Sequence, residues 1–189
     1  KKQILEAKTL VAVDDLYRPY RPKRRTRAII AKERGLEPLA NILSLQQTAK
    51  TMEEEAKAYI NIEKDVETVE DALAGAMDIV AEAISDEAQY RQYIRDITMK
   101  KGVLSSEAKD ADEESVYEMY YGFSEPVAKL AGHRVLALNR GEKEKLLTVK
   151  IEAPQEDIFR YLKKKIIRRD NPNTTPYLER TIEDAYSRL

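Results

Sequence analysis

Apolar side chains recur at helical spacing along most of this chain, and the pattern predicts a mainly α protein. The most regular stretch is residues 69–84, where apolar positions follow the i, i+4, i+7 spacing of one buried helix face. Weaker stripes over residues 1–16, 86–99, 154–169 and 176–189 predict further amphipathic helices. We therefore expect a multi-helical array with helical hairpins and at most one small two-stranded β element.

The helix predicted over residues 69–84 has clear start and packing signals. Thr68 precedes it and is a typical N-cap residue. Leu73, Met77 and Val80 share one face and are expected in the core, and the small residues of segment 72–76 allow a close helix crossing. We expect the next helix to begin at Ser85 and to end at Gly102, after two lysines in its last turn.

A helical hairpin is predicted between residues 26 and 45. Thr26 can cap a helix that runs to Arg34, Gly35 suits the left-handed position that follows it, and Glu37-Pro38 can open a second helix. The same turn chemistry occurs in a DNA-reading helix-turn-helix and in any other helical hairpin. The second helix carries no cation, which favours the generic hairpin.

Strand signals are few. Residues 146–151, LLTVKI, form the one convincing strand, and residues 103–107 are the partner that the chain offers. Between them, residues 133–140 read as a helix closed by Gly141. We expect a helical subdomain over residues 1–130 and a smaller one, with the strand, over residues 131–189.

Residues 14–39, DDLYRPYRPKRRTRAIIAKERGLEPL, combine prolines with a dense run of cations. Pro19 and Pro22 each fix their own φ and disfavour the α region for the preceding residue, which predicts an extended, non-helical backbone over residues 17–22. Guanidinium groups that project from a pre-ordered backbone suit the recognition of phosphate or carboxylate. We call residues 17–25 the basic strap.

Charge is strongly segregated along the chain, although 33 basic and 34 acidic residues nearly balance. Segment 51–90 carries twelve acidic residues and two lysines, so it will not bind phosphate. Basic patches occur at the strap, around residues 134–145 and on the outward face of the 154–169 helix. The cations of that last face are Arg160, Lys163, Lys164, Lys165, Arg168 and Arg169.

The candidate nucleic-acid-binding residues come from the first two patches. They are Lys23, Arg24, Arg25, Arg27, Arg134, Arg140 and Lys143. The alternative is that the arginines pair with internal carboxylates and serve the fold. Within the strap we expect Arg18 and Arg21 to make such internal pairs, and Lys23, Arg24 and Arg25 to face solvent.

A tyrosine cluster, Tyr117, Tyr120 and Tyr121, has the same two interpretations. Aromatic rings can stack on single-stranded bases, but four glutamates surround this cluster, which favours a packing role.

No catalytic or metal-binding constellation is present in the sequence. The chain has no cysteine and one histidine, His133, and its six glycines are isolated. We therefore expect no enzyme activity, no cofactor and no metal. There is no signal peptide and no apolar run long enough to cross a membrane, so we expect a soluble, cytoplasmic protein without a membrane partner.

Two motifs resemble one family. DDLYRPYRPKRRTRA followed by IAKERGLEPLA closely resembles a signature of the Tex family of bacterial transcription accessory proteins, and GHRVLALNRGEKEKLL resembles a second. The order and spacing of the motifs extend the resemblance over the whole chain. It implies an internal fragment of the amino-terminal helical region, as expected from a chain that opens and closes inside helical patterns.

The resemblance also implies that an RNase-H-like domain, helix-hairpin-helix units and an OB-fold domain follow in the full-length protein, and that most nucleic-acid binding lies on the OB-fold domain. Two functions remain open. One is a non-catalytic helical scaffold that contributes to association with RNA or DNA. The other is a protein-interaction or architectural module without direct nucleic-acid contact. The partners implied are RNA or DNA, RNA polymerase or other transcription machinery, and other domains of the same chain.

Overall fold

The computed structural model describes residues 2–22, 24–110 and 114–189, which form two compact units. Unit 1 comprises Lys1–Gln92 and Phe159–Leu189, and unit 2 comprises Tyr93–Ile158. This division differs from the one expected at residue 130. The chain leaves unit 1 within one helix and returns within another, so no glycine-rich or proline-rich linker marks the boundaries in the sequence.

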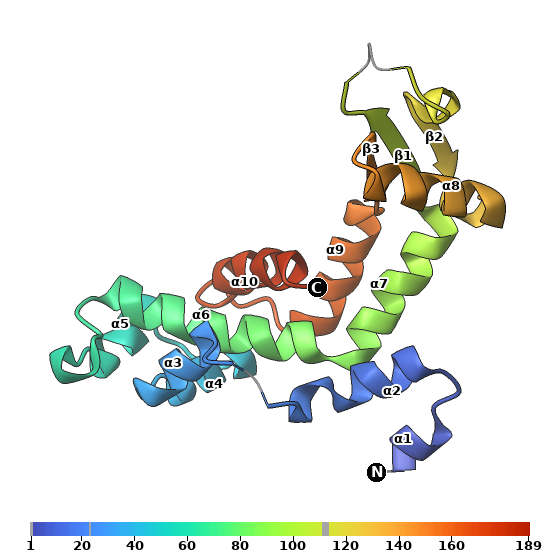
Figure 1. Cartoon of the computed structure of the whole chain (residues 1–189). Helices are drawn as coiled ribbons and strands as arrows, with labels where there is room; N and C mark the ends of the chain where they lie inside the picture. The colour runs from blue at the N-terminus through green and yellow to red at the C-terminus, as the bar shows by residue number, and fades with distance from the viewer. Residues whose placement is uncertain (1, 23, 111–113) are drawn as a thin grey trace. The chain divides into compact units, whose positions relative to one another are not determined.

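The described residues are predominantly helical, and Figure 1 labels the elements. The helices wholly within unit 1 are α1 (Lys2–Glu6), α2 (Leu10–Tyr17), α3 (Arg27–Glu33), α4 (Glu37–Leu45), α5 (Met52–Ala56), α6 (Val69–Asp86) and α10 (Thr175–Ser187). Its 3-10 turns are η1 (Arg18–Tyr20), η2 (Lys57–Tyr59) and η3 (Ile62–Lys64). Helices α7 (Ala88–Lys101) and α9 (Gln155–Ile166) carry the chain between the units. Unit 2 adds β1 (Val103–Ala108), η4 (Glu118–Tyr120), β2 (Phe123–Pro126), η5 (Val127–Lys129), α8 (Gly132–Lys143) and β3 (Leu147–Glu152).

Helix α6 is the centre of unit 1 and packs against α3, α4, α5 and α10 (Figure 1). Thr68 caps it as predicted, through a capping box in which Thr68 and Asp71 each bond the other's backbone N–H. Leu73 and Val80 are buried, which confirms two of the three predicted core residues, whereas Met77 is half-buried. The apolar stripe of this helix therefore organises the unit.

The small residues of α6 permit the close crossing that the sequence predicted. A Cβ placed on Gly75 would lie 3.2 Å from the Cβ of Ala31 and would clash with the Leu36 side chain. Ala72 and Ala76 are fully buried on the same helix. Helix α3 can approach the α6 backbone this closely only because these positions lack larger side chains.

The α3–α4 hairpin forms as predicted. Thr26 caps α3, Gly35 adopts φ 84°, and Pro38 stands in the first turn of α4. Helix α4 buries Leu39, Ala40 and Leu43 and packs against α6 and α10. The hairpin is thus an integral part of the core of unit 1.

Two helix boundaries differ from the prediction. The single helix expected over residues 1–16 is broken, and Thr9, in an extended conformation, caps α2 by accepting the N–H of Ala12 at 3.2 Å. Helix α6 continues through Ser85 to Asp86, and the break falls at Glu87, whose ψ of 113° is extended. In both cases the apolar period alone did not reveal a local change of backbone direction.

The described residues of unit 2 form three strands, where at most two were predicted. β1 lies between β2 and β3 and is antiparallel to both, so that Val103 faces Pro126 on one side and Glu152 on the other. The predicted pairing of β1 with β3 is confirmed. β2 was missed because it is four residues long and ends in a proline, a residue that weakens a strand prediction and is tolerated here because β2 is an edge strand.

The prediction that Gly141 ends the helix was wrong, because α8 continues to Lys143. Gly141 lies inside the helix and is buried, and a Cβ there would come within 2.6 Å of the Leu147 side chain on β3. The left-handed residue after the helix is Lys145, with φ 65°. Gly141 therefore serves close packing of α8 on the sheet.

The tyrosine cluster packs inside unit 2. Tyr117 and Tyr120 are each 5% exposed and join Leu104, Leu138 and Leu147 in one apolar core. The backbone carbonyl of Tyr120 accepts a hydrogen bond from the buried Ser106 hydroxyl at 2.7 Å. The packing interpretation is thereby confirmed for these two rings.

Candidate nucleic-acid interface

The basic strap is not extended throughout. Residues Arg18–Tyr20 form the 3-10 turn η1, and Arg18 adopts φ −51° and ψ −44° although a proline follows it. The prediction of a non-helical backbone was wrong here, because Pro19 stands at the start of a new turn, where its missing N–H costs nothing. Arg21, before Pro22, is extended as predicted, with ψ 140°.

The first two arginines of the strap make the internal pairs that were expected. Arg18 Nε lies 3.3 Å from Asp86 Oδ1 at the end of α6. Arg21 pairs with Asp14 on α2. Neither guanidinium is therefore fully available to a phosphate.

A third pair, which the sequence did not reveal, fixes α2 more firmly. Arg91 Nε on α7 donates to Asp15 Oδ1 at 3.0 Å, and the two side chains are only 15% and 7% exposed. Arg91 also donates to the backbone carbonyl of Ser85 at 3.3 Å. The two partners are 76 residues apart in the sequence, so no local pattern connects them.

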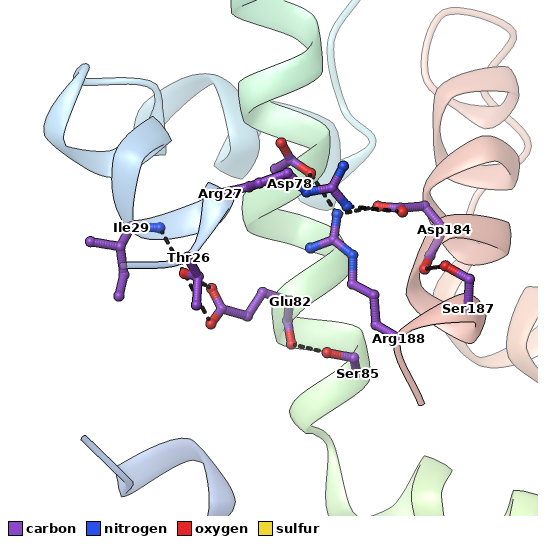
Figure 2. Close-up of polar contacts among 9 residues, drawn as sticks. All are labelled: Thr26, Arg27, Ile29, Asp78, Glu82, Ser85, Asp184, Ser187 and Arg188. Carbon is purple, nitrogen blue, oxygen red and sulfur yellow. Dashed lines mark hydrogen bonds and ion pairs between the residues drawn. The ribbon is translucent and has the colours of Figure 1, made fainter. Parts of the chain in front are cut away.

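Arg27, a predicted nucleic-acid-binding residue, belongs to a group of four charged side chains that we call the α6 clasp. Arg27 comes from α3, Asp78 from α6, Asp184 from α10, and Arg188 from the residue that follows α10. Figure 2 shows these side chains meeting between the three helices. Arg27 Nε lies 3.3 Å from Asp78 and its Nη2 lies 3.2 Å from Asp184.

Arg188 completes the clasp from the other side. Its Nη2 lies 2.5 Å from Asp78 Oδ1 and also pairs with Asp184. Burial by itself would lower the pKa of Arg188, but its hydrogen bonds to both aspartates outweigh that effect and raise the pKa. Two cations and two carboxylates thus neutralise each other, and the clasp joins the three helices.

Thr26 adds a neutral link beside the clasp. Its hydroxyl accepts the N–H of Ile29 at 3.2 Å, as an N-cap, and donates to the Glu82 carboxylate on α6 at 3.2 Å (Figure 2). The capping residue predicted from sequence therefore also ties α3 to α6.

Arg24 and Arg25 are exposed as expected. Arg25 is 72% exposed and pairs with Glu33, itself 55% exposed, at 3.0 Å. Arg24 forms no ion pair among the described residues and lines a hollow with Arg18, Arg21 and Arg188. Lys23 lies outside the described residues.

The second predicted patch lies on α8 in unit 2. Arg134 Nη1 pairs with Glu125 at 2.7 Å, and its guanidinium lies 5.7 Å from the centre of the Phe123 ring, so this residue holds α8 to β2. Arg140 and Lys143 stand on the last two turns of α8, are exposed, and form no ion pair within the described part of the chain.

The structure also reveals an exposed cationic group that was not chosen from the sequence. Lys164, Lys165, Arg168 and Arg169 are exposed at and just beyond the end of α9, and we call this group the α9 cationic end. The neighbouring Lys163 pairs with Glu179 on α10 at 2.8 Å. The run KKKIIRR was visible as a basic face, but the sequence did not show which members had carboxylate partners.

No cluster of acidic or histidine side chains suited to a metal ion occurs in residues 2–22, 24–110 and 114–189. His133 is exposed in the first turn of α8, as expected for a polar residue at a helix start. None of the described helices is both long and apolar enough to span a bilayer.

Comparison with known proteins identifies the family. A family described as Tex central region-like matches residues 47–185. The chain is 49% identical, over its whole length, to the uncharacterized protein YdcI of Bacillus subtilis and covers 27% of that protein. It is 34% identical over 83% of its length to the transcriptional accessory protein Tex of Neisseria gonorrhoeae, covering 21% of it. A human relative, S1 RNA-binding domain-containing protein 1, is 29% identical over 79% of the chain, which spans 16% of that protein.

The chain combines a helical core, internal ion pairs and a small sheet, and it spans 27% of the length of its Bacillus relative. The family match covers most of these elements and agrees with the two sequence motifs. The chain belongs to the Tex central region-like family.

Proposed function

We propose that this region is a non-catalytic helical scaffold of a Tex-like transcription accessory protein and that it contributes to association with RNA or DNA. The observation that carries the proposal is the division among its cations. Arg18, Arg27 and Arg134 are engaged with partly buried carboxylates, whereas Arg24, Arg140 and Lys143 are exposed and form no ion pair among the described residues.

Exposed, unpaired cations are what a sequence-independent phosphate contact requires. Most of the binding free energy in such a contact comes from release of counterions from the nucleic acid, and a guanidinium already held by a carboxylate contributes little. Arg25 is an intermediate case, since its pair with Glu33 is largely exposed and is screened by salt. Arg24, Arg25, Arg140 and Lys143 are accordingly the residues assigned to this role.

The names of relatives support a nucleic-acid setting for the whole protein. One is called a transcriptional accessory protein and another an S1 RNA-binding domain-containing protein. Because the chain spans about a quarter or less of each relative, the main affinity is assigned to other domains and a weak auxiliary contact to this region.

The test is a salt titration of RNA binding by the chain and by the double variants Arg24→Ala/Arg25→Ala and Arg140→Ala/Lys143→Ala. A phosphate contact predicts a Kd of about 10⁻⁴ to 10⁻⁶ M at physiological salt and a reduction of about 0.7 in the single-strand salt slope for each cation removed. Arg27→Ala serves as the comparison. It should lower the melting temperature and leave the salt slope of RNA binding nearly unchanged. Slopes that are unchanged in both double variants would overturn the assignment.

A specific observation favours a second function, an architectural module without nucleic-acid contact. The α6 clasp and the Arg18–Asp86 pair use the acidic helix α6 to neutralise arginines from three other segments. In this alternative the region positions other domains or binds RNA polymerase. The same titration distinguishes the two, since this module would show no salt-dependent RNA affinity at all.

A further inference from the structure

The α9 cationic end combines a fixed backbone with four exposed cations that have no carboxylate partner among the described residues. Lys164, Arg168 and Arg169 form no ion pair among the described residues. Lys165 lies 5.7 Å from the centre of the Tyr161 ring, a cation–π contact that leaves its charge uncompensated. Asp170 is adjacent in the sequence and is also exposed, so the net charge of residues 164–170 is +3.

Gln46 fixes this group in place. It is 4% exposed, and its side-chain Nε2 donates to the carbonyl of Ile166 at 2.8 Å. Its Oε1 accepts the backbone N–H groups of Arg168 at 2.9 Å and Arg169 at 3.1 Å. Asn171 Nδ2 then donates to the carbonyl of Gln46 at 3.2 Å. The end of α9 is therefore anchored to the end of α4, and the two arginines start from an ordered backbone.

A hollow of about 400 Å³ opens beside these cations. Its apolar wall includes Val80, Ala83 and Ile84 of α6, and Tyr90, Lys165 and Arg168 also line it. We call it the α9 hollow. Its size lies at the small end of the range for ligand pockets, where one aromatic base fits.

The surroundings restrict where a phosphate can lie. A neighbouring hollow of about 580 Å³ shares Val80, Ala83 and Glu87 with the α9 hollow, but Glu37, Glu82 and Asp86 line it. Among the residues that the structure describes, Glu87 is the one carboxylate that lines the α9 hollow itself. Phosphates are thus favoured at Lys165 and Arg168 and disfavoured further along α6.

We propose that the α9 cationic end and the α9 hollow form a binding site for single-stranded nucleic acid, with one base in the hollow beside Tyr90 and the flanking phosphates on Lys165 and Arg168. A hollow with an apolar wall and an aromatic side chain, next to ordered cations, suits a single strand, since each base has a face to stack and each nucleotide a phosphate to pair. A duplex keeps its bases stacked internally, so it offers only its phosphates to the cations and leaves the α9 hollow unoccupied.

An acidic protein segment is the competing occupant. Its carboxylates would use the cations but would leave the hollow and Tyr90 unused. This site rests on the proposed function, because both assume that the region binds nucleic acid. It uses different residues from the contact assigned to Arg24, Arg25, Arg140 and Lys143. The two are therefore separable by mutation.

The experiment measures binding of a fluorescein-labelled oligouridine of about 12 nucleotides by fluorescence anisotropy over a range of salt concentrations. The 189-residue chain is compared with the variants Lys165→Gln and Arg168→Gln, and with Lys57→Gln, which removes an exposed cation from the acidic part of unit 1. We expect the salt slope to fall by about 0.7 for each of the first two variants and to stay constant for the third. Thermal melts check that each variant is folded.

The hollow is tested separately with Tyr90→Phe and Tyr90→Leu. The phenylalanine variant keeps the ring and should bind as the parent chain does, whereas loss of the ring should weaken oligouridine binding about tenfold. Binding of a duplex RNA of equal length should not distinguish the two variants. Tyr90 is only partly buried, and its ring packs edge-on against Tyr161, a contact that Tyr90→Phe keeps; thermal melts check that Tyr90→Leu remains folded.

Three results would overturn the proposal. One is an unchanged slope for both Lys165→Gln and Arg168→Gln; if Arg24→Ala/Arg25→Ala lowers the slope in the same assay, this site fails while the proposed function stands. Another is equal oligouridine affinity for Tyr90→Phe and Tyr90→Leu. The last is a labelled oligoglutamate peptide that binds more tightly than oligouridine and loses affinity in Arg168→Gln, which would assign the site to an acidic protein segment.

Discussion

The α6 clasp and the α9 cationic end lie in the same unit and use the same residue types in opposite ways. In the clasp, Arg27 and Arg188 reach carboxylates on other helices, at distances of 3.3 Å and 2.5 Å from Asp78. At the end of α9, Arg168 and Arg169 have their backbone fixed by Gln46, while their side chains are exposed. The first arrangement uses charge to join helices, and the second keeps charge available.

The difference shows that what surrounds an arginine, rather than the density of arginines, decides its role. Removing one member of a partly buried pair leaves its partner charged and poorly hydrated, which is costly even where the pair itself contributes little net stability. Removing an exposed cation costs almost nothing. Stability and nucleic-acid affinity should therefore respond to different arginines.

The largest effect is expected for Asp78→Asn. This change removes one of the two carboxylates that Arg27 and Arg188 share. Because the side chains of Asp78 and Arg188 are 19% and 21% exposed, we expect the free energy of unfolding to fall by about 3 kcal/mol. Urea denaturation measures it. Asp65→Asn is the matched control, since Asp65 is 85% exposed and 3.9 Å from Arg34, and should lose less than about 0.5 kcal/mol. Equal losses of stability in the two variants would show that the α6 clasp contributes no more than an exposed surface ion pair.

Gln46→Ala should destabilise the chain by about 2 kcal/mol, because it leaves the backbone groups of Ile166, Arg168 and Arg169 without their partners in a largely buried site. Chemical denaturation again provides the measurement. Gln47→Ala, at the exposed neighbouring position, should change stability by less than about 0.5 kcal/mol. If Gln46→Ala also changes stability by less than about 0.5 kcal/mol, the Gln46 side chain does not anchor the end of α9.

Arg18→Gln and Arg168→Gln compare the two kinds of arginine directly. Arg18 pairs with an Asp86 side chain that is 12% exposed, so we expect a loss of about 1 kcal/mol. Arg168→Gln should stay within about 0.5 kcal/mol of the parent chain. A denaturation midpoint that falls more for Arg168→Gln than for Arg18→Gln would reverse the comparison.

The smallest effect is expected for Tyr177→Phe on α10, which removes a neutral hydroxyl that donates a hydrogen bond to the Glu53 carboxylate. Burial and a hydrogen bond to Glu53 raise the pKa of Tyr177 to about 12. Because this pKa lies above that of an unfolded tyrosine, about 10, the contribution is fully present below pH 10 and is lost as pH rises towards 12. Midpoints measured from pH 8 to pH 11 should fall less steeply for Tyr177→Phe. Identical pH profiles would show that the phenol does not contribute.

The sequence predicted most of unit 1 because its helices have local signals. Thr26, Thr68 and Gly35 mark helix ends within one turn of the residues they affect, and the apolar period of α6 identifies its buried face. The breaks at Thr9 and Glu87 were missed since the apolar period continues across them. The third strand was missed because an edge strand as short as β2 has too few residues to show alternation.

The candidate site was less predictable, for a different reason. An ion pair such as that of Arg188 with Asp78 spans 110 residues, and neither residue carries a sign of the other. The sequence showed three basic patches but not which cations α6 would neutralise. Arg27 and Arg134 were therefore selected together with Arg24 and Arg140, although their environments differ.

Unit 2 is inserted between the two segments of unit 1, and this has a consequence for folding during synthesis. Helix α6 packs against α10, which leaves the ribosome about 100 residues later. At a translation rate of about 5–20 residues per second, the apolar face of α6 that α10 covers waits on the order of 5–20 s for its partner. A nascent chain that ends before α10 should therefore be a substrate for chaperones, and unit 2 should fold before unit 1 is complete.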